Sequence, residues 1–182
     1  MGQKVRPTGF RVGIMTDWAS AWYANKRDFS ELLIEDFRIR KFIAAYLTKT
    51  KDRKELRPAI AKIRIERTRE RVSVMVYSSR VGAIIGKKGE KIDKLTKALE
   101  KLTRRHIEVK TIEVTRPEID AQIIAEDIAE QLEKRSSLRR TMKTAMQRAM
   151  EGGARGSSCN CPADSAEPKW PAARRAWTAA FR

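Results

Sequence analysis

Two glycines and two lysines stand together at Gly86-Lys87-Lys88-Gly89, between an apolar run and an amphipathic segment. Glycine lets the backbone approach a ligand closely because no side chain intervenes. Lys87 and Lys88 bring positive charge to the loop tip, and Lys91 adds a cation just beyond it. A helix predicted to begin near Gly89 directs free N–H groups and its positive dipole end to the same place. These residue types at this spacing favour a loop that grips a sugar-phosphate backbone.

Two other interpretations of this stretch are weaker. The segment from Gly82 to Lys88 is superficially similar to a nucleotide-binding P-loop, but three residues separate its glycines instead of four. In addition, Lys88 stands where Ser or Thr must hold Mg²⁺, so nucleotide hydrolysis is disfavoured. A purely structural turn is the second alternative, and the paired lysines argue against it.

The charge of the chain points to a polyanionic partner. The 182 residues include 40 Lys and Arg against 23 Asp and Glu, which gives a net charge of +17, and the pI is about 10.3. This excess is far beyond what solubility requires and is typical of proteins that bind nucleic acid. A membrane-surface role is disfavoured because the sequence has no long apolar segment and no amphipathic anchor. The N-terminus lacks a signal-peptide core, so we expect a cytoplasmic protein.

The sequence predicts no catalytic residues, no metal site and no cofactor. His106 is the only histidine, so no catalytic set based on several histidines can form. Cys159 and Cys161 form a single C-x-C pair, whereas a structural zinc site needs four ligands. We expect them to be free thiols in a reducing compartment.

The order of predicted elements indicates an α+β protein. Residues 1–28 read as an N-terminal arm whose Trp18, Trp22 and Tyr23 could stack on bases or pack on the neighbouring domain, with packing favoured. Residues 29–116 follow as helix, strand, strand, short helix, loop, helix and strand. The first helix is predicted from the apolar residues Leu33, Phe37, Phe42, Tyr46 and Leu47, the second long helix from a core face of Ile92, Leu95, Leu99 and Leu102, and the last strand from Ile107, Val109, Ile112 and Val114, with a bulge.

Residues 117–156 predict two amphipathic helices. An Ile and Leu stripe marks the first, and Leu138, Met142, Met146 and Met150 mark a core face on the second. Such helices need a partner layer, normally a sheet, but no strand pattern follows Gly156. The second helix also carries Arg139, Arg140 and Lys143. On its own this basic group is as consistent with a solvated face as with a binding surface.

These elements resemble the type II KH fold, in which such a loop holds about four nucleotides of single-stranded nucleic acid. More specifically, the opening Gly2-Gln3-Lys4-Val5, the loop Ile84 to Glu90 and the helix Leu138 to Lys143 resemble, in the same order, the bacterial family of small-subunit ribosomal protein S three. The resemblance covers about residues 1–156.

This resemblance implies a KH domain and a second α/β domain in the head of the small ribosomal subunit. The implied partners are small-subunit ribosomal RNA, neighbouring ribosomal proteins and messenger RNA. Gly86, Lys87, Lys88, Gly89 and Lys91 would contact RNA, while Arg139, Arg140 and Lys143 would line the messenger entry channel. The family also implies no enzymatic turnover. The alternative function is a free-standing KH-type regulator or RNA chaperone.

Residues 157–182 depart from the family, which continues with strands and a glycine-rich S-G-R-L-x-G-A-E signature. This segment can be translated in a shifted reading frame, in which each new codon is the third base of one codon and the first two bases of the next, starting at Gly156. Codon choices that the residues of this chain permit then encode V-K-L-Q-L-S-G-R-L-G-G-A-E-M-A-R. We therefore predict that residues 157–182 are an out-of-frame, poorly ordered tail and that the second domain is truncated to its helices. Three prolines and the absence of sustained periodicity agree with this.

Overall fold

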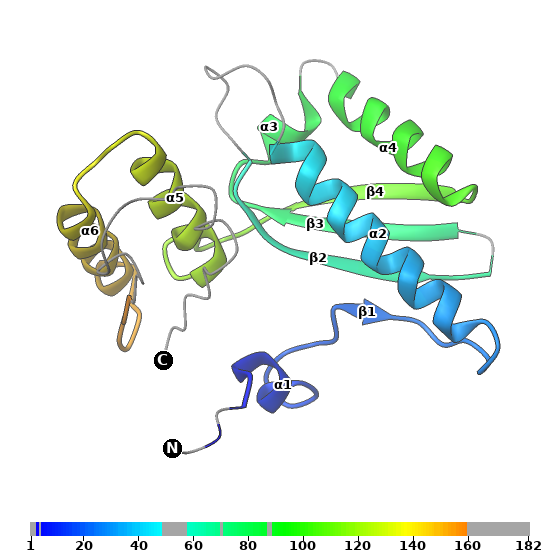
Figure 1. The fold of residues 1–182 in the computed structure, drawn as a ribbon, viewed down its shortest axis with the longest axis horizontal. Helices are drawn as coiled ribbons and strands as arrows, with labels where there is room; N and C mark the ends of the chain where they lie inside the picture. The colour runs from blue at the N-terminus through cyan, green and yellow to red at the C-terminus, as the bar shows by residue number, and fades with distance from the viewer. Residues whose placement is uncertain (1–2, 4, 49–57, 70, 87–88, 160–182) are drawn as a thin grey trace. The chain divides into compact units, whose positions relative to one another are not determined.

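The computed structural model describes residues 3, 5–48, 58–69, 71–86 and 89–159. It divides the chain into two compact units, Met1–Val114 and Thr115–Arg182. Figure 1 shows both.

The first unit is a four-stranded sheet with helices on one face (Figure 1). Its elements, in chain order, are α1 (Pro7–Arg11), β1 (Ser20–Ala21), α2 (Phe29–Thr48), β2 (Ile60–Arg67), β3 (Arg71–Ser78), α3 (Val81–Ile85), α4 (Glu90–Thr103) and β4 (His106–Glu113). The strand order is β1-β2-β3-β4. Strand β2 pairs antiparallel with β3, and the two outer pairings, β1 with β2 and β3 with β4, are parallel. The α+β class and the predicted order from α2 to β4 are confirmed.

The core of this unit lies between the sheet and its helices. Alternate positions along β3 point inward because side chains in a strand alternate between the two faces. Val72, Val74 and Val76 are accordingly buried. Ile65 of β2 and Ile107 of β4 lie beside them in the sheet, and the buried apolar residues of the helices pack over this face: Ile39, Ile43 and Leu47 of α2, Ile84 of α3, and Leu95 and Leu99 of α4. This packing fixes α3 and α4, and therefore the loop that joins them, against the sheet.

Helix α2 forms where the apolar spacing predicts it, but only some of the residues that predict it are buried. Leu47 lies in the core and Phe42 packs against it. Leu33 and Phe37 are 52% and 64% exposed, while Asp36, Ile39 and Ile43 are buried. An apolar stripe on α2 therefore faces away from the core. The buried positions could not be identified from spacing alone, because two apolar stripes run along this helix and the buried one contains the carboxylate of Asp36.

Two smaller predictions were also wrong. Leu102, placed on the core face of α4, is 40% exposed because it lies near the end of the helix. Strand β4 contains no bulge, since its pairing with β3 is continuous from Arg71↔His106 to Ser78↔Glu113. The irregularity in the sheet lies instead between Ile60 and Lys62 of β2.

The second unit contains two helices, α5 (Ala121–Glu133) and α6 (Leu138–Glu151). Asp120 caps α5 by accepting hydrogen bonds from the backbone N–H groups of Gln122 and Ile123. Helix α6 buries Thr141 and Ala149. Of the predicted core face, Leu138, Met142 and Met146 are half-buried, whereas Met150 is 49% exposed. Within the described part of this unit no strand accompanies the helices, and residues 160–182 of the predicted tail lie outside the described residues.

Candidate nucleic-acid interface

The loop between α3 and α4 begins at a glycine that no other residue can replace without strain. Gly86 ends α3 with φ +73° and ψ −174°, and its N–H donates to the carbonyl oxygen of Gly82. This backbone conformation is essentially restricted to glycine. A Cβ atom placed on Gly86 would lie 2.6 Å from Cγ of Lys91, which shows that the lysine stem lies directly against the glycine backbone. The structure therefore brings Gly86 and Lys91 together.

Gly89 ends the loop and starts α4. It is the N-cap residue in the left-handed region, φ +82°, and offers no side chain to the free N–H groups of the first turn. Such N–H groups form a ready anion site at a helix N-terminus. Glu90 and Asp93, in that first turn, lower the positive potential there. Lys87 and Lys88, the predicted phosphate ligands at the tip, lie outside the described residues.

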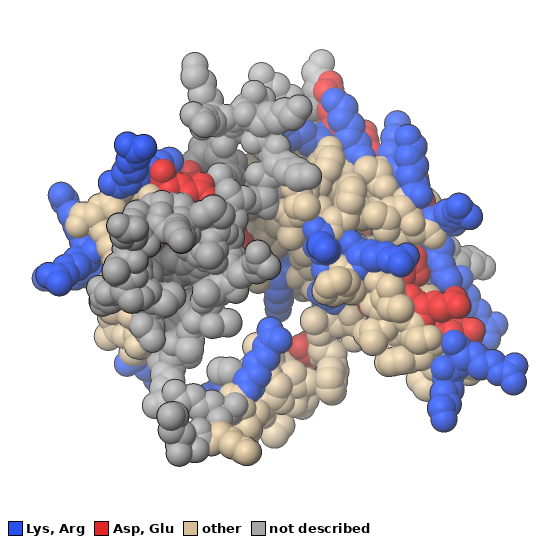
Figure 2. Space-filling model, viewed as in Figure 1, with Lys and Arg blue, Asp and Glu red and all other residues tan. Residues whose placement is uncertain are grey.

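Helix α4 continues the basic character of the loop along its outer face. Lys94, Lys97 and Lys101 are exposed and follow one another at helical spacing. Figure 2 shows Lys and Arg side chains over the edge of the first unit where Figure 1 places α4. This stripe was not predicted from the sequence, although the spacing of three and four residues between the lysines indicates a shared helix face.

A second basic group lies on α6 in the other unit. Arg139, Arg140 and Lys143 are all exposed, and Arg139 and Lys143 are four residues apart, on one face of the helix. No carboxylate of the described residues forms an ion pair with any of the three. Their charge is therefore available to a ligand.

The aromatic residues of the arm divide into two kinds. Trp22 packs on Phe29 with a ring-centroid distance of 5.2 Å, and its indole N–H donates to Asp36 at 2.8 Å. Trp18 and Tyr23 are 67% and 93% exposed. The predicted packing on the neighbouring domain is thus right for Trp22 and wrong for the other two.

Catalytic and metal-binding sites most often use histidine, cysteine and acidic residues. His106 begins β4, is exposed and lies 2.9 Å from Glu100. The described residues hold no cluster of three or more His, Cys, Asp or Glu side chains that could bind a metal ion. Among the same residues, no helix has the length and apolar character needed to cross a membrane. Cys159 is partly buried, and Cys161 lies outside the described residues.

The geometry agrees with a comparison of the chain with known proteins. Residues 38–119 match the KH domain family. This range contains the loop, α3, α4 and the three long strands of the sheet.

Many curated relatives are small ribosomal subunit proteins. The protein named uS3 of Desulforudis audaxviator is 46% identical over 125 residues, 69% of this chain and 54% of the relative. The uS3 proteins of Rhodopirellula baltica and Acetivibrio thermocellus are 50% and 51% identical over the same length. The aligned part is shorter than the 156 residues expected, and the chain spans about half the length of these relatives. Over these 125 residues, the chain is a relative of the uS3 proteins of the small ribosomal subunit.

Proposed function

We propose that this chain is a non-catalytic component of the small ribosomal subunit in the cytoplasm and that it binds small-subunit ribosomal RNA. One observation carries the proposal: the loop between α3 and α4 combines a glycine-only backbone at Gly86 with an uncapped helix N-terminus at Gly89. The relatives are named as small ribosomal subunit proteins, which supports the ribosome as the place of action.

The loop suits a phosphate backbone better than a base edge. Backbone N–H groups and lysine ammonium groups recognise phosphate oxygens and carry no direct sequence information. The basic stripe of Lys94, Lys97 and Lys101 extends this surface beyond the loop. Single-stranded RNA running from the loop along α4 would pass Glu90 and Asp93 in the first turn and then meet the positive charge of these lysines.

The first test replaces Lys87 and Lys88 by Asp. The affinity for an unstructured RNA should fall, and its dependence on salt should become shallower by about 0.7 for each phosphate that the loop no longer neutralises. The measurement is the Kd at several salt concentrations. The first unit should stay folded because its core residues lie elsewhere.

The control variant carries Arg38→Asp and Lys41→Asp on α2, two exposed positions that change the net charge by the same amount. It should leave the salt dependence nearer to that of the unmodified chain. An equal flattening in both variants would mean that general charge, and not the loop, binds the RNA.

The basic group on α6 supports a second contact, with messenger RNA. Arg139, Arg140 and Lys143 can follow one strand because they project from one side of a helix. Alanine at all three positions should impair translation through structured messenger while leaving the binding of short RNA by the loop unchanged. Equal impairment in both measurements would contradict a channel role.

The exposed apolar stripe of α2 supports contact with neighbouring ribosomal proteins. Leu33, Ile34 and Phe37 are each at least half exposed, and Phe29 extends the stripe at 48%. Contiguous apolar surface of this kind marks protein interaction sites. Co-sedimentation with small subunits tests the whole proposal, since a free-standing KH regulator or RNA chaperone would remain in the supernatant.

A further inference from the structure

The N-terminal arm lies against the sheet through very little backbone pairing. Strand β1 has two residues, which pair with Ile65 and Glu66 of β2. One flanking hydrogen bond runs from the N–H of Ile65 to the carbonyl oxygen of Ala19 at 3.0 Å. Strands usually contain at least three residues. This ladder alone is therefore too short to hold the arm.

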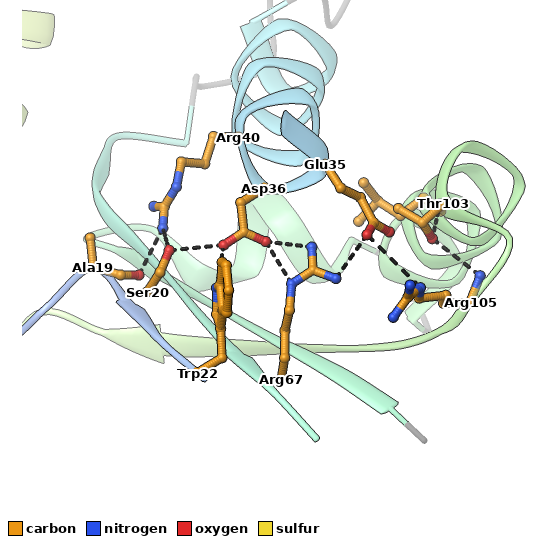
Figure 3. Close-up of polar contacts among 10 residues, drawn as sticks. Ala19, Ser20, Trp22, Glu35, Asp36, Arg40, Arg67, Thr103 and Arg105 are labelled. Atoms are coloured by element: carbon orange, nitrogen blue, oxygen red, sulfur yellow. Dashed lines mark hydrogen bonds and ion pairs between the residues drawn. The ribbon is translucent and has the colours of Figure 1, made fainter. Parts of the chain in front are cut away.

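The arm is held instead by side chains that converge on one buried carboxylate. The Asp36 side chain is 3% exposed. Its Oδ2 accepts hydrogen bonds from Ser20 Oγ at 2.9 Å and from Trp22 Nε1 at 2.8 Å. Its Oδ1 accepts from the guanidinium of Arg67, whose Nε lies 2.8 Å away. Figure 3 shows Asp36 between the arm on one side and Arg67 on the other.

The two oxygen atoms of Asp36 therefore serve different parts of the molecule. Arg67 also pairs with Glu35 at 2.9 Å, so its interaction with Oδ1 belongs entirely to the α2 and β2 framework. Oδ2 receives both of its donors from the arm. Removing the arm's donors leaves the buried ion pair intact, which makes docking of the arm separable from folding of the sheet.

Arg40 reinforces the same contact from α2. Its guanidinium donates to the carbonyl oxygen of Ala19 and to Ser20 Oγ, both at 2.7 Å, and to the carbonyl oxygen of Ile63. Burial lowers the pKa of Arg40, and the nearby Asp36 carboxylate raises it in part. An arginine remains charged at neutral pH despite such a shift. The arm thus meets a preformed donor at Arg40 and a preformed acceptor at Asp36.

We infer that Asp36 is a positioning residue that docks the N-terminal arm as a separate unit and thereby makes the arm a second RNA-contacting surface. This second step rests on the proposed RNA-binding function. Trp18 and Tyr23, on either side of the docked segment, keep their rings exposed, and Lys26 and Arg27 are exposed beside them. Exposed rings among basic residues suit the stacking of single-stranded bases. Docking fixes these groups before RNA arrives, which removes the cost of ordering them on binding.

The test uses the full chain with Ser20→Ala and Trp22→Phe, which remove both donors to Oδ2 and keep an aromatic ring on Phe29. The control variant, Ser30→Ala with Tyr46→Phe, likewise removes a serine hydroxyl and the polar atom of an aromatic side chain, at exposed positions of α2 outside the proposed RNA-contacting surface. Hydrogen exchange of the Ile65 amide should become at least about tenfold faster only in the first variant, the factor expected from losing about 1.4 kcal/mol of docking free energy. The amide of Val74, in the central strand, should be unaffected. Unchanged exchange at Ile65, or equal acceleration at Val74, would overturn separable docking.

The RNA step is measured on the same two variants. An unstructured RNA long enough to reach both surfaces should bind several-fold more weakly to the Ser20→Ala, Trp22→Phe variant. An RNA of about four nucleotides, the length a KH loop holds, should bind equally to both. Faster exchange at Ile65 with unchanged affinity for the long RNA would overturn the role of the arm in binding. Failure of the proposed function gives a different result from failure of the arm's role. In that case the variant with Asp at positions 87 and 88 would bind RNA as tightly as the unmodified chain, whether or not the arm is docked.

Discussion

Gly86 and Gly89 flank the same loop for different physical reasons. At Gly86 both the backbone angles and the space are restrictive, because the stem of Lys91 occupies the position of a Cβ atom. At Gly89 the angles are left-handed, φ +82°, but no atom lies within 4 Å of a Cβ placed there. The first glycine is therefore required by sterics and strain together, the second by backbone strain alone.

This difference predicts unequal costs of substitution. Gly86→Ala should lower the free energy of unfolding by about 2–3 kcal/mol, since the side chain must strain the backbone and displace Lys91. Gly89→Ala should cost about 1–2 kcal/mol, the usual penalty of the left-handed region for alanine. Urea unfolding of the two variants measures both values. Equal costs would show that the Lys91 side chain moves away from the new methyl group without lowering the free energy of unfolding.

At the scale of the element, α2 shows that spacing alone does not identify a buried face. Both of its stripes satisfy helical periodicity, and one of them is exposed at Leu33 and Phe37. The buried stripe accepts Asp36 only because Arg67, Ser20 and Trp22 satisfy the carboxylate. A buried charge with partners of this kind is tolerated, whereas an unpaired one is not.

The two faces of α2 can be distinguished by alanine substitution. Ile39→Ala should destabilise the protein by about 2–5 kcal/mol because Ile39 is fully buried and the change leaves a cavity. Leu33→Ala, on the exposed stripe, should change the free energy of unfolding by less than about 0.5 kcal/mol. Chemical denaturation of the free protein is the measurement. A larger cost at Leu33 would place that residue in the core.

The sequence predicts most of the elements because their signals are local. Alternating valines identify β3, and the two glycines locate the loop between α3 and α4. The contacts of Asp36 were not predictable in this way, since Ser20, Trp22 and Arg67 lie 14 to 31 residues from it. Nothing in the spacing of these four residues indicates that they meet. The position of the arm therefore became clear only from the structure.

At the scale of the whole molecule, the two units differ in how completely they are built. The first surrounds a core with a sheet and helices, whereas the described part of the second consists of α5 and α6. Met150 on α6 is 49% exposed, and α5 and α6 are the helices that the described part of this unit contains, with no strand among the same residues. Two amphipathic helices normally need a further layer. We therefore expect the second unit to unfold more readily than the first and to promote aggregation.

The described residues place no sheet beside α5 and α6, which agrees with a prediction about the coding DNA. Residues 157–182 should prove to be an out-of-frame translation of the segment that continues the uS3 family, so that the shifted frame reads V-K-L-Q-L-S-G-R-L-G-G-A-E-M-A-R. Part of this is fixed already: Trp170 has the single codon TGG, and its last base joined to the CC of Pro171 gives GCC, alanine. Likewise, the third base of Asn160 joined to the TG of Cys161 gives leucine whichever pyrimidine is present.

Sequencing the DNA decides between a frameshift and a genuinely different tail. A frameshift requires each third base that the residues leave open to be the one that completes the glycine-rich signature. Restoring the frame should then supply strands that can pack on α5 and α6. The restored protein should be more soluble than the present chain, with cooperative unfolding of the second unit, because the apolar faces of both helices would be covered by a sheet. Codons that do not spell the family segment in the shifted frame would refute this origin.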